Sequence, residues 1–376
     1  MLQLVRVTLR EIRLPLREPF QISSGTMTER RIALLELEDA SGAISWSECV
    51  ADDAPNYLPE TIDVAWLAMT KWAIPRVLGS SFAGPGDVHA ALEKDFRGHQ
   101  MAKAAVEMGM WGLEAERLGI PLARLIGGTR EEIDVGISLG IQASPAALVD
   151  KARAALALGY RKIKLKIKPG KDVDYVRAVR EALPDAPIMA DANNAYTLED
   201  VDALIAMDSL GLMMFEQPLA WDDIVRHAEL QPRLTTPICL DESITSLERA
   251  QDMLRLGSGR IINIKPGRVG GFTSSLAIHD FCEANGIPVW CGGMLESGIG
   301  RAYNVALASL PNFVKPGDVS PSARYWTRDI VTPEWTMTPQ GTTLVPLDKP
   351  GIGVLVDRNR VDQLTVRSET LRHGSA

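Results

Sequence analysis

The chain has 376 residues, of which 46% are hydrophobic and 23% charged, and its formal net charge is −8. These values are ordinary for a folded protein with a large core. No dense basic run with interleaved aromatic residues occurs, and the longest apolar runs are much shorter than a membrane span, so we expect neither a nucleic-acid nor a membrane partner. The N-terminus alternates like a strand and lacks the continuous apolar core of a secretion signal.

The cysteines and histidines give no sign of a zinc site or a nucleophilic triad. Neither set has the spacing of metal ligands, so we expect reduced core cysteines in a cytoplasmic protein. The residues concerned are Cys49, Cys239, Cys282, Cys291, His89, His99, His227, His279 and His373.

The first 130 residues predict an α+β domain. The stretch MLQLVRVTLREIRLPL alternates like a strand, and RRIALLELEDASGAISWSECV has two strand-like halves around a turn at Ser41-Gly42. Two helical stretches follow, PETIDVAWLAMTKWAIPRVLG and RGHQMAKAAVEMGMWGLEAERLG, each ending near a glycine.

Five apolar runs in the next part of the chain each end in a charged residue. The runs are RKIKLK, APIMAD, GLMMFE, TPICLD and RIINIK, and their last residues, Lys166, Asp191, Glu216, Asp241 and Lys265, are 25, 25, 25 and 24 residues apart. VGISLG before the series and IPVWCGG after it extend the pattern. Short apolar strands that alternate with helices predict a parallel sheet covered on both faces.

Helix signals stand between these runs, at Ser144-Pro145, at Gly159, at Thr197 with Asp200 and at Thr245 with Glu248. Seven or eight strand–helix units at this period favour an α/β fold of the modified, TIM-like (β/α) barrel type, with an open doubly wound sheet as the alternative. We expect the barrel over residues 131–325, an α+β capping domain over residues 1–130, and a C-terminal segment, 326–376, that packs back on the capping domain.

Three of the strand-end charges are carboxylates. In a barrel the C-terminal strand ends meet at one mouth, so Asp191, Glu216 and Asp241 would lie close together and repel one another unless a cation bridges them. An all-oxygen set favours Mg²⁺, with Mn²⁺ or another divalent cation as a substitute. Each carboxylate taken singly could instead cap the following helix.

Two lysines flank the carboxylates. Lys166 and Lys265 would stand on opposite sides of the cation, either as ion-pair partners of the acids or as a pair of bases with lowered pKa values. Lys164 and Arg268 could supply the positive charge that lowers those pKa values. Of the remaining lysines of RKIKLKIKPG, Lys162 and Lys168 are predicted to be surface charges. A cation facing two opposed bases suits removal of the proton next to a carboxylate, and therefore racemisation.

These residues resemble those of the enolase superfamily, for which a lysine base working with Mg²⁺ is a known pattern. The stretches KLK at 164–166, DAN at 191–193, EQP at 216–218, DES at 241–243 and NIKPG at 263–267 are similar to the muconate lactonising subgroup. Within it, PFQISSGTMTERR at 19–31 and WCGGMLESGIGRA at 290–302 resemble the N-acylamino acid racemase and o-succinylbenzoate synthase family, and the likeness covers essentially the whole chain.

The resemblance implies a role for each matching position. Asp191, Glu216 and Asp241 would bind Mg²⁺, Lys166 and Lys265 would be the acid/base pair, and Lys164 would assist near the substrate carboxylate. In the dehydration that forms o-succinylbenzoate, a step of menaquinone biosynthesis, Lys166 would be the base and Lys265 would stabilise the intermediate as a cation. Loops around residues 20–26 and near Tyr57 would close over the substrate. The expected substrate contacts are Phe20, Tyr57, Ser138, Asn193, Gly292, Gly293 and Met294, with Arg268 and Glu242 in support.

Other functions stay open from the sequence. A muconate-type cycloisomerase would use the same first step, and a Schiff-base lyase or aldolase would use Lys166 as a nucleophile. A metal-binding scaffold without turnover would not need two bases facing one metal. The expected partner is a small-molecule carboxylate, and the family commonly forms homo-oligomers.

Overall fold

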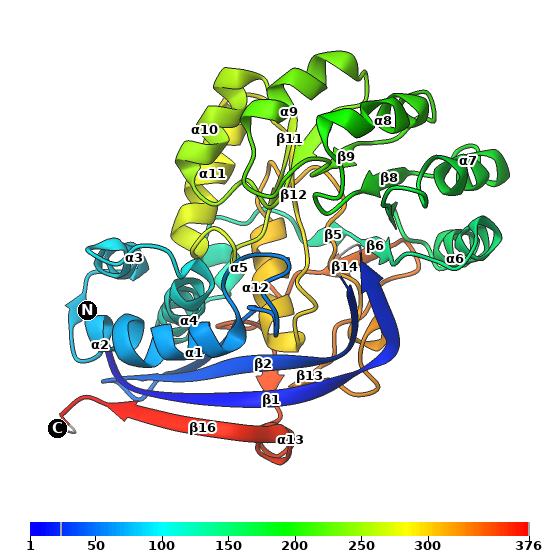
Figure 1. The fold of residues 1–376 in the computed structure, drawn as a ribbon. Helices are drawn as coiled ribbons and strands as arrows, with labels where there is room; N and C mark the ends of the chain where they lie inside the picture. The colour runs from blue at the N-terminus through cyan, green and yellow to red at the C-terminus, as the bar shows by residue number, and fades with distance from the viewer. Residues whose placement is uncertain (23–24, 375–376) are drawn as a thin grey trace.

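Two sheets organise the molecule, and a computed structural model describes them over residues 1–22 and 25–374 (Figure 1). One is an antiparallel sheet with strand order β16-β1-β2-β3, with β4 beside β1. The other is a parallel sheet of seven strands in the order β12 to β6. No helix in the described ranges is long and apolar enough to cross a membrane.

The antiparallel sheet and the helices packed on it form the capping domain. Its strands are β1 (Leu2–Ile22), β2 (Gly25–Asp39), β3 (Ile44–Cys49), β4 (Ser81–Phe82) and β16 (Thr365–Arg372). Its helical segments are α1 (Ile62–Ala68), a π-helical turn (Met69–Ala73), α2 (Ile74–Val77), α3 (Pro85–Glu93), α4 (Gln100–Leu118) and α5 (Leu122–Leu125). The predicted turn at Ser41-Gly42 is present: Asp39 accepts a hydrogen bond from the Ser41 N–H, and Gly42 takes a φ of 86° that favours glycine.

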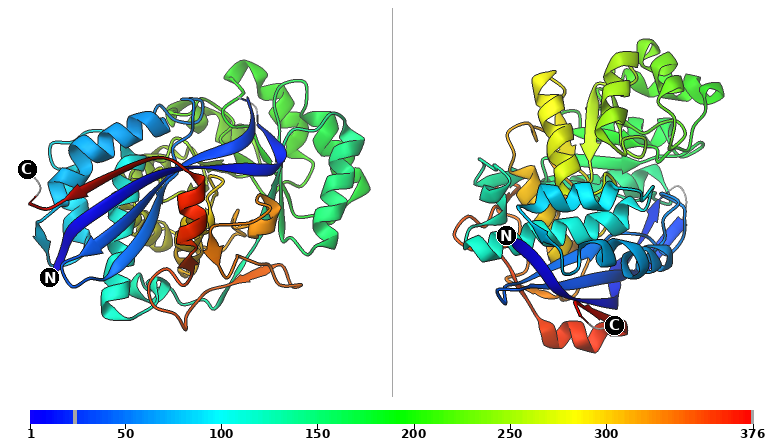
Figure 2. Two further views of the ribbon diagram at one scale, coloured as in Figure 1. Left: turned by 90° about the horizontal axis from the view of Figure 1, so that it is seen from below. Right: turned by 90° about the vertical axis from the view of Figure 1, so that its left-hand side faces the viewer.

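The two ends of the chain meet in this sheet. Strand β16 pairs antiparallel with β1, from Arg6 opposite Arg372 to Ile12 opposite Thr365. Seen from below, β16 runs alongside β1, and α13 (Arg358–Leu364) leads into it (Figure 2). The last strand of the chain therefore belongs to the same sheet as the first.

Parallel strands and helices alternate through the barrel. The strands are β6 (Gly136–Leu139), β7 (Lys162–Lys166), β8 (Ile188–Asp191), β9 (Phe215–Glu216), β10 (Ile238–Leu240), β11 (Ile261–Ile264) and β12 (Val289–Cys291). The helices are α6 (Pro145–Ala157), α7 (Val173–Ala182), α8 (Val201–Asp208), α9 (Val225–Leu230), α10 (Leu247–Leu256), α11 (Phe272–Ala284) and α12 (Gly298–Ala308). Short 3₁₀ turns span Leu198–Asp200, Gln231–Arg233 and Ser322–Arg324. Two small antiparallel pairs join β5 (Glu132–Asp134) to β14 (Thr342–Leu344) and β13 (Val331–Thr332) to β15 (Leu355–Val356).

Two of the three predicted helix starts are confirmed. Ser144 caps α6 by accepting from the Ala147 N–H, and Thr197 forms a capping box with Asp200. The prediction at Thr245 is wrong by one residue: Ser246 has the extended backbone of a cap, and α10 begins after it.

A segment after α12 closes the barrel. The Asp318 N–H donates to the Cys291 carbonyl of β12 over 2.9 Å, and the Gly136 N–H of β6 donates to the Gly317 carbonyl over 2.7 Å. These bonds link the two end strands of the seven-stranded sheet, so residues 317 and 318 occupy the eighth position of the barrel. The prediction of a modified (β/α) barrel with a capping domain is confirmed, and the open sheet is excluded.

Side chains inside the barrel form layers because alternate residues of a strand face the same side. Below the mouth, an apolar cluster of Met189, Met214, Cys239, Ile261 and Trp290 fills the interior. The cysteine prediction holds for all four cysteines, which are buried and free.

Candidate active site

The lysine face of RKIKLKIKPG points into the barrel. Lys162 is 0% exposed and Lys164 is 3% exposed, so the prediction that Lys162 is a surface charge is wrong. Strand β7 lies between β6 and β8, and its inward residues are enclosed by the barrel wall. Lys168 lies beyond the strand and is partly exposed, as predicted.

The strand ends bring the predicted carboxylates to one mouth. Lys166 lies opposite Asp191 in the β7–β8 register, and Asp191 lies opposite Glu216 in the β8–β9 register. Asp241 directly follows β10, the next strand. All three carboxylates are at most 1% exposed, so each is removed from water and needs a partner charge.

Lys166 occupies one side of the mouth. Its Nζ lies 2.7 Å from Asp191 Oδ2 and donates to Asn193 Oδ1 over 2.5 Å. The Asn193 amide in turn donates to Glu242 over 3.2 Å. Asn193 therefore connects Lys166 to a second buried acid.

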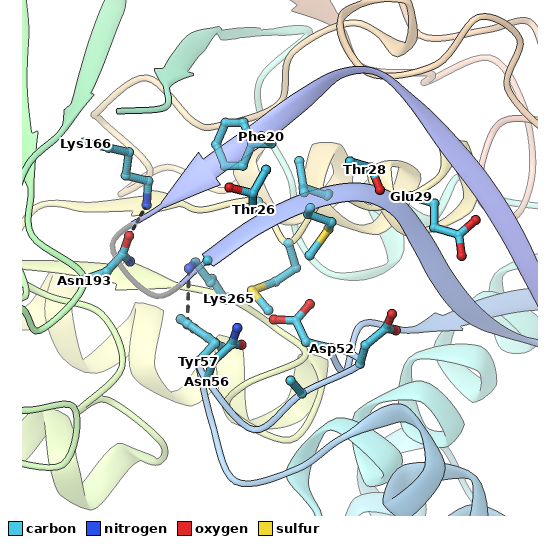
Figure 3. Close-up of a pocket in the computed structure, with 17 residues that line it drawn as sticks. Phe20, Thr26, Thr28, Glu29, Asp52, Asn56, Tyr57, Lys166, Asn193 and Lys265 are labelled. Atoms are coloured by element: carbon cyan, nitrogen blue, oxygen red, sulfur yellow. Dashed lines mark hydrogen bonds between the residues drawn. The ribbon is translucent and has the colours of Figure 1, made fainter. Parts of the chain in front are cut away.

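Lys265 occupies the other side, after β11. Its Nζ lies 2.8 Å from Asp241 Oδ2 and donates to the Tyr57 hydroxyl of the capping domain over 3.1 Å. Arg268 contacts the other oxygen of Asp241 and also donates to Tyr57 over 3.3 Å. Figure 3 shows the Lys166–Asn193 and Lys265–Tyr57 pairs bordering one space, with Phe20 and Thr26 reaching over it.

Lys164 lies deeper, among three carboxylates. Its Nζ is 3.3 Å from Asp191, 3.2 Å from Glu216 and 2.6 Å from Asp318. Asp318, on the barrel-closing segment, also lies 3.2 Å from the Lys162 ammonium. Sequence reasoning missed Asp318, because the residues before it, PNFVKPGD, do not form an apolar run like those that end in Asp191, Glu216 and Asp241.

The electrostatics of the mouth set the protonation of its groups. Burial, and then the charge of Asp191, raises the pKa of Glu216 to about 8. Burial also raises the pKa of Glu242 to about 8, assisted by the charge of Asp241. Burial alone would raise the pKa of Asp241, but Lys265 and Arg268 outweigh it and lower that pKa.

The protein's own groups raise the pKa of Lys265, whereas the lowered pKa predicted for a lysine that faces a metal cation stays a prediction. Burial lowers the pKa of this ammonium, but the charges of Asp241 and Tyr57 outweigh burial and hold it well above the ordinary value. The neighbouring Lys164 opposes this effect without reversing it. A lowered pKa at Lys265 would therefore require Asp241 to be engaged elsewhere.

Each of the three carboxylates lies within 3.3 Å of a lysine ammonium group: Asp191 and Glu216 contact Lys164, and Asp241 contacts Lys265. Among the described residues, the only set of three potential ligands with atoms within 4.8 Å of each other is His279, Asp280 and Glu283. That set lies on α11, and both ring nitrogens of His279 already have partners, Asp280 and the Asn312 N–H. In contrast, Asp191, Glu216 and Asp241 are an all-oxygen set at the mouth, and burial together with the charge of Asp191 raises the pKa of Glu216 within it.

A cavity of about 430 Å³ lies between the mouth and the capping domain. Both Lys166 and Lys265 line it, together with the predicted contacts Phe20, Tyr57, Asn193, Gly293 and Met294. Ser138 lines a smaller adjoining cavity with Lys164. Of the predicted loop at residues 20–26, residues 23 and 24 lie outside the described ranges.

Gly292 lies behind these cavities. Its N–H donates to Asn263 over 2.7 Å, and an added Cβ would come within 2.6 Å of the Lys265 side chain. In the structure, Gly292 therefore lies against Asn263 and the stem of the Lys265 side chain. Asn263, which sequence reasoning also missed, donates to Glu216 over 2.7 Å and so fixes that carboxylate.

A barrel with buried acids and lysines at its mouth and a capping domain above them defines an enzyme-like architecture, and the comparisons with known proteins agree. Residues 4–127 match the family described as the mandelate racemase / muconate lactonizing enzyme N-terminal domain, and residues 147–360 match the family described as enolase C-terminal domain-like. The chain belongs to the enolase superfamily.

Relatives place the chain within that superfamily. It is 49% identical to an o-succinylbenzoate synthase from Geobacillus kaustophilus, over 96% of this chain and 95% of that protein. It is 46% identical to an N-succinylamino acid racemase from Thermus thermophilus, over 95% and 96% of the two chains. A crystal structure of an enolase superfamily member from Listeria innocua superposes with a TM-score of 0.95 at 39% identity, covering 99% of this chain and 100% of that one.

Proposed function

We propose that this enzyme abstracts the proton next to the carboxylate of an N-acylamino acid or a related acid, with Lys166 and Lys265 as the acid/base pair. The observation that carries the proposal is that both ammonium groups border the same cavity from separate strands. A substrate held there would present its two faces to two different lysines. One lysine removes the α-proton and the other returns a proton to the opposite face, which inverts the carbon.

We propose Asp191, Glu216 and Asp241 as the residues that hold Mg²⁺. Their buried, all-oxygen donor set is the chemistry that this cation prefers, and the raised pKa of Glu216 supports a need for added positive charge. When bound, the cation supplies charge stabilisation for the electrons left on the substrate carboxylate. Asn263 and Asn193 orient the site from behind, through Glu216 and Lys166 respectively.

Racemisation of N-succinylamino acids and dehydration to o-succinylbenzoate both begin with this proton abstraction. Relatives carrying each name are nearly equally similar to the chain, at 49% and 46% identity. We therefore propose either or both activities, in a cytoplasmic and homo-oligomeric enzyme.

Proton NMR in D₂O tests the proposal. N-succinyl-L-phenylalanine is incubated with the protein and Mg²⁺, and the α-proton signal is followed. We expect the signal to disappear and to persist when a chelator is added. A signal that persists with Mg²⁺ would contradict the racemase activity, and formation of o-succinylbenzoate would then decide whether the dehydration remains.

A further inference from the structure

Asp318 is held rigidly where it enters the barrel. Its N–H donates to the Cys291 carbonyl over 2.9 Å, and its own carbonyl accepts from Arg301 over 2.6 Å. The residue is 6% exposed. With its backbone fixed on both sides, the carboxylate has a defined direction into the barrel.

This carboxylate bridges two lysines of β7. One oxygen lies 2.6 Å from Lys164 Nζ and the other lies 3.2 Å from Lys162 Nζ. The Lys162 ammonium stacks over the Trp290 ring, 3.3 Å from its centre, below the substrate cavity. Lys164 lines the small cavity that also contains Lys166, so only one of the two bridged lysines reaches the site.

Lys164 depends on Asp318 more than on its other partners. Its contacts with Asp191 and Glu216 are longer, at 3.3 Å and 3.2 Å, and both of those residues are proposed metal ligands. A carboxylate engaged by a cation is a weaker partner for an ammonium group, and the cation itself repels that group. Of the three acids that contact Lys164, Asp318 is then the one that is not a proposed metal ligand.

We propose that Asp318 is a positioning residue that holds the Lys164 ammonium where it binds the substrate carboxylate, an inference that rests on the proposed function above. Asp318 also lines the small cavity beside Lys164. Its role in this proposal is exerted through the Lys164 ammonium, which its carboxylate contacts over 2.6 Å. The barrel-closing segment thereby contributes to substrate binding as well as to the fold.

A purely structural role would be to neutralise the buried Lys162. Three variants separate the two roles: Asp318→Asn, Lys162→Met, and the double variant, which has neither the acid nor the lysine that needs it. For N-succinyl-L-phenylalanine, we expect Asp318→Asn and the double variant to raise KM about tenfold or more, with a smaller change in kcat, and Lys162→Met to stay near wild type. A double variant with the KM of Lys162→Met would overturn the proposal.

A second measurement needs no turnover. Each protein is treated with a trace of acetic anhydride, and acetylation of Lys164 is compared by mass spectrometry with that of the exposed Lys71. We expect Lys164 to become several-fold more reactive in the double variant, because its ammonium is no longer held, while the buried Lys103 stays protected in folded protein. Unchanged Lys164 reactivity would overturn the positioning role, whereas an inactive wild type would overturn only the proposed function.

Discussion

The barrel mouth and the contact between capping domain and barrel both bury carboxylates, but they neutralise them differently. At the mouth, Asp191 and Asp241 are paired with lysine ammonium groups. At the contact, Glu107 of α4 accepts from the Phe272 and Thr273 N–H groups at the start of α11, at 2.7 and 2.9 Å.

Glu48 of β3 is bound in the same way as Glu107, by the N–H groups at the start of a helix. It accepts from the N–H groups of Ser297 and Gly300 at the start of α12, at 3.1 and 3.0 Å. Backbone amides at a helix start cannot leave their positions without unwinding the helix, whereas lysine side chains can exchange partners. We therefore expect the contact to contribute mainly to stability and the mouth mainly to catalysis. Substitutions at the contact should lower the free energy of unfolding, and substitutions at the mouth should lower activity.

The largest effect is expected at Lys166. Lys166→Ala removes one of the two proposed bases, so racemisation of N-succinylphenylalanine, followed by polarimetry, should fall by about a hundredfold or more with little change in melting temperature. Lys168→Ala, two residues further along, is the matched control and should remain near wild type. Undiminished turnover in folded Lys166→Ala would contradict the assignment.

The next effect is expected at the proposed metal ligands. Glu216→Gln weakens an all-oxygen site, so the Mg²⁺ concentration that gives half-maximal activity should rise about tenfold or more. Glu181→Gln, an exposed change on α7, serves as the control for a lost charge. An unchanged Mg²⁺ titration in Glu216→Gln would show that this carboxylate does not hold the cation.

Substitution at the contact should affect stability first. Glu107→Ala leaves the buried Phe272 N–H and the partly buried Thr273 N–H without their acceptor. It should lower the free energy of unfolding by about 1–3 kcal/mol in urea, while kcat per folded molecule changes little. Glu283→Ala, at an exposed position of α11, should have almost no effect on unfolding. Equal stability losses in the two variants would show that the hydrogen bonds of Glu107 at the contact do not stabilise the fold.

The last prediction is a pH dependence of stability at Glu48. Burial raises the pKa of this carboxyl to about 7 from an ordinary value of 4.5, so the folded state binds its proton more tightly than the unfolded state. Its contribution to stability is therefore full below about pH 4.5 and is lost as the pH rises to about 7. Glu48→Gln should remove this decline, changing the stability difference from wild type by up to about 1.4 kcal/mol per pH unit across that window. A constant difference in unfolding free energy would contradict the raised pKa.

The residues of the barrel mouth could be predicted from the sequence because they recur at a regular spacing along the chain. Lys166, Asp191 and Glu216 end strands at a constant period, and parallel strands end at the same side of a barrel. Lys162 was misplaced because its burial depends on Asp318, which lies far along the chain on a segment too short to be recognised as a strand. Glu48 and Glu107 were missed for a similar reason: each accepts from backbone N–H groups at the start of a distant helix, and such contacts leave no side-chain pattern in the sequence.

The most direct test of two opposed bases is enantiomer-specific exchange. Lys166→Ala and Lys265→Ala are each incubated with the L- and D-forms of N-succinylphenylalanine in D₂O with Mg²⁺, and α-proton loss is followed by NMR. Lysines on opposite faces predict that each variant exchanges at most one enantiomer, that the two variants differ in which one, and that neither racemises. Exchange of both enantiomers by one variant would contradict the assignment of one lysine to each face.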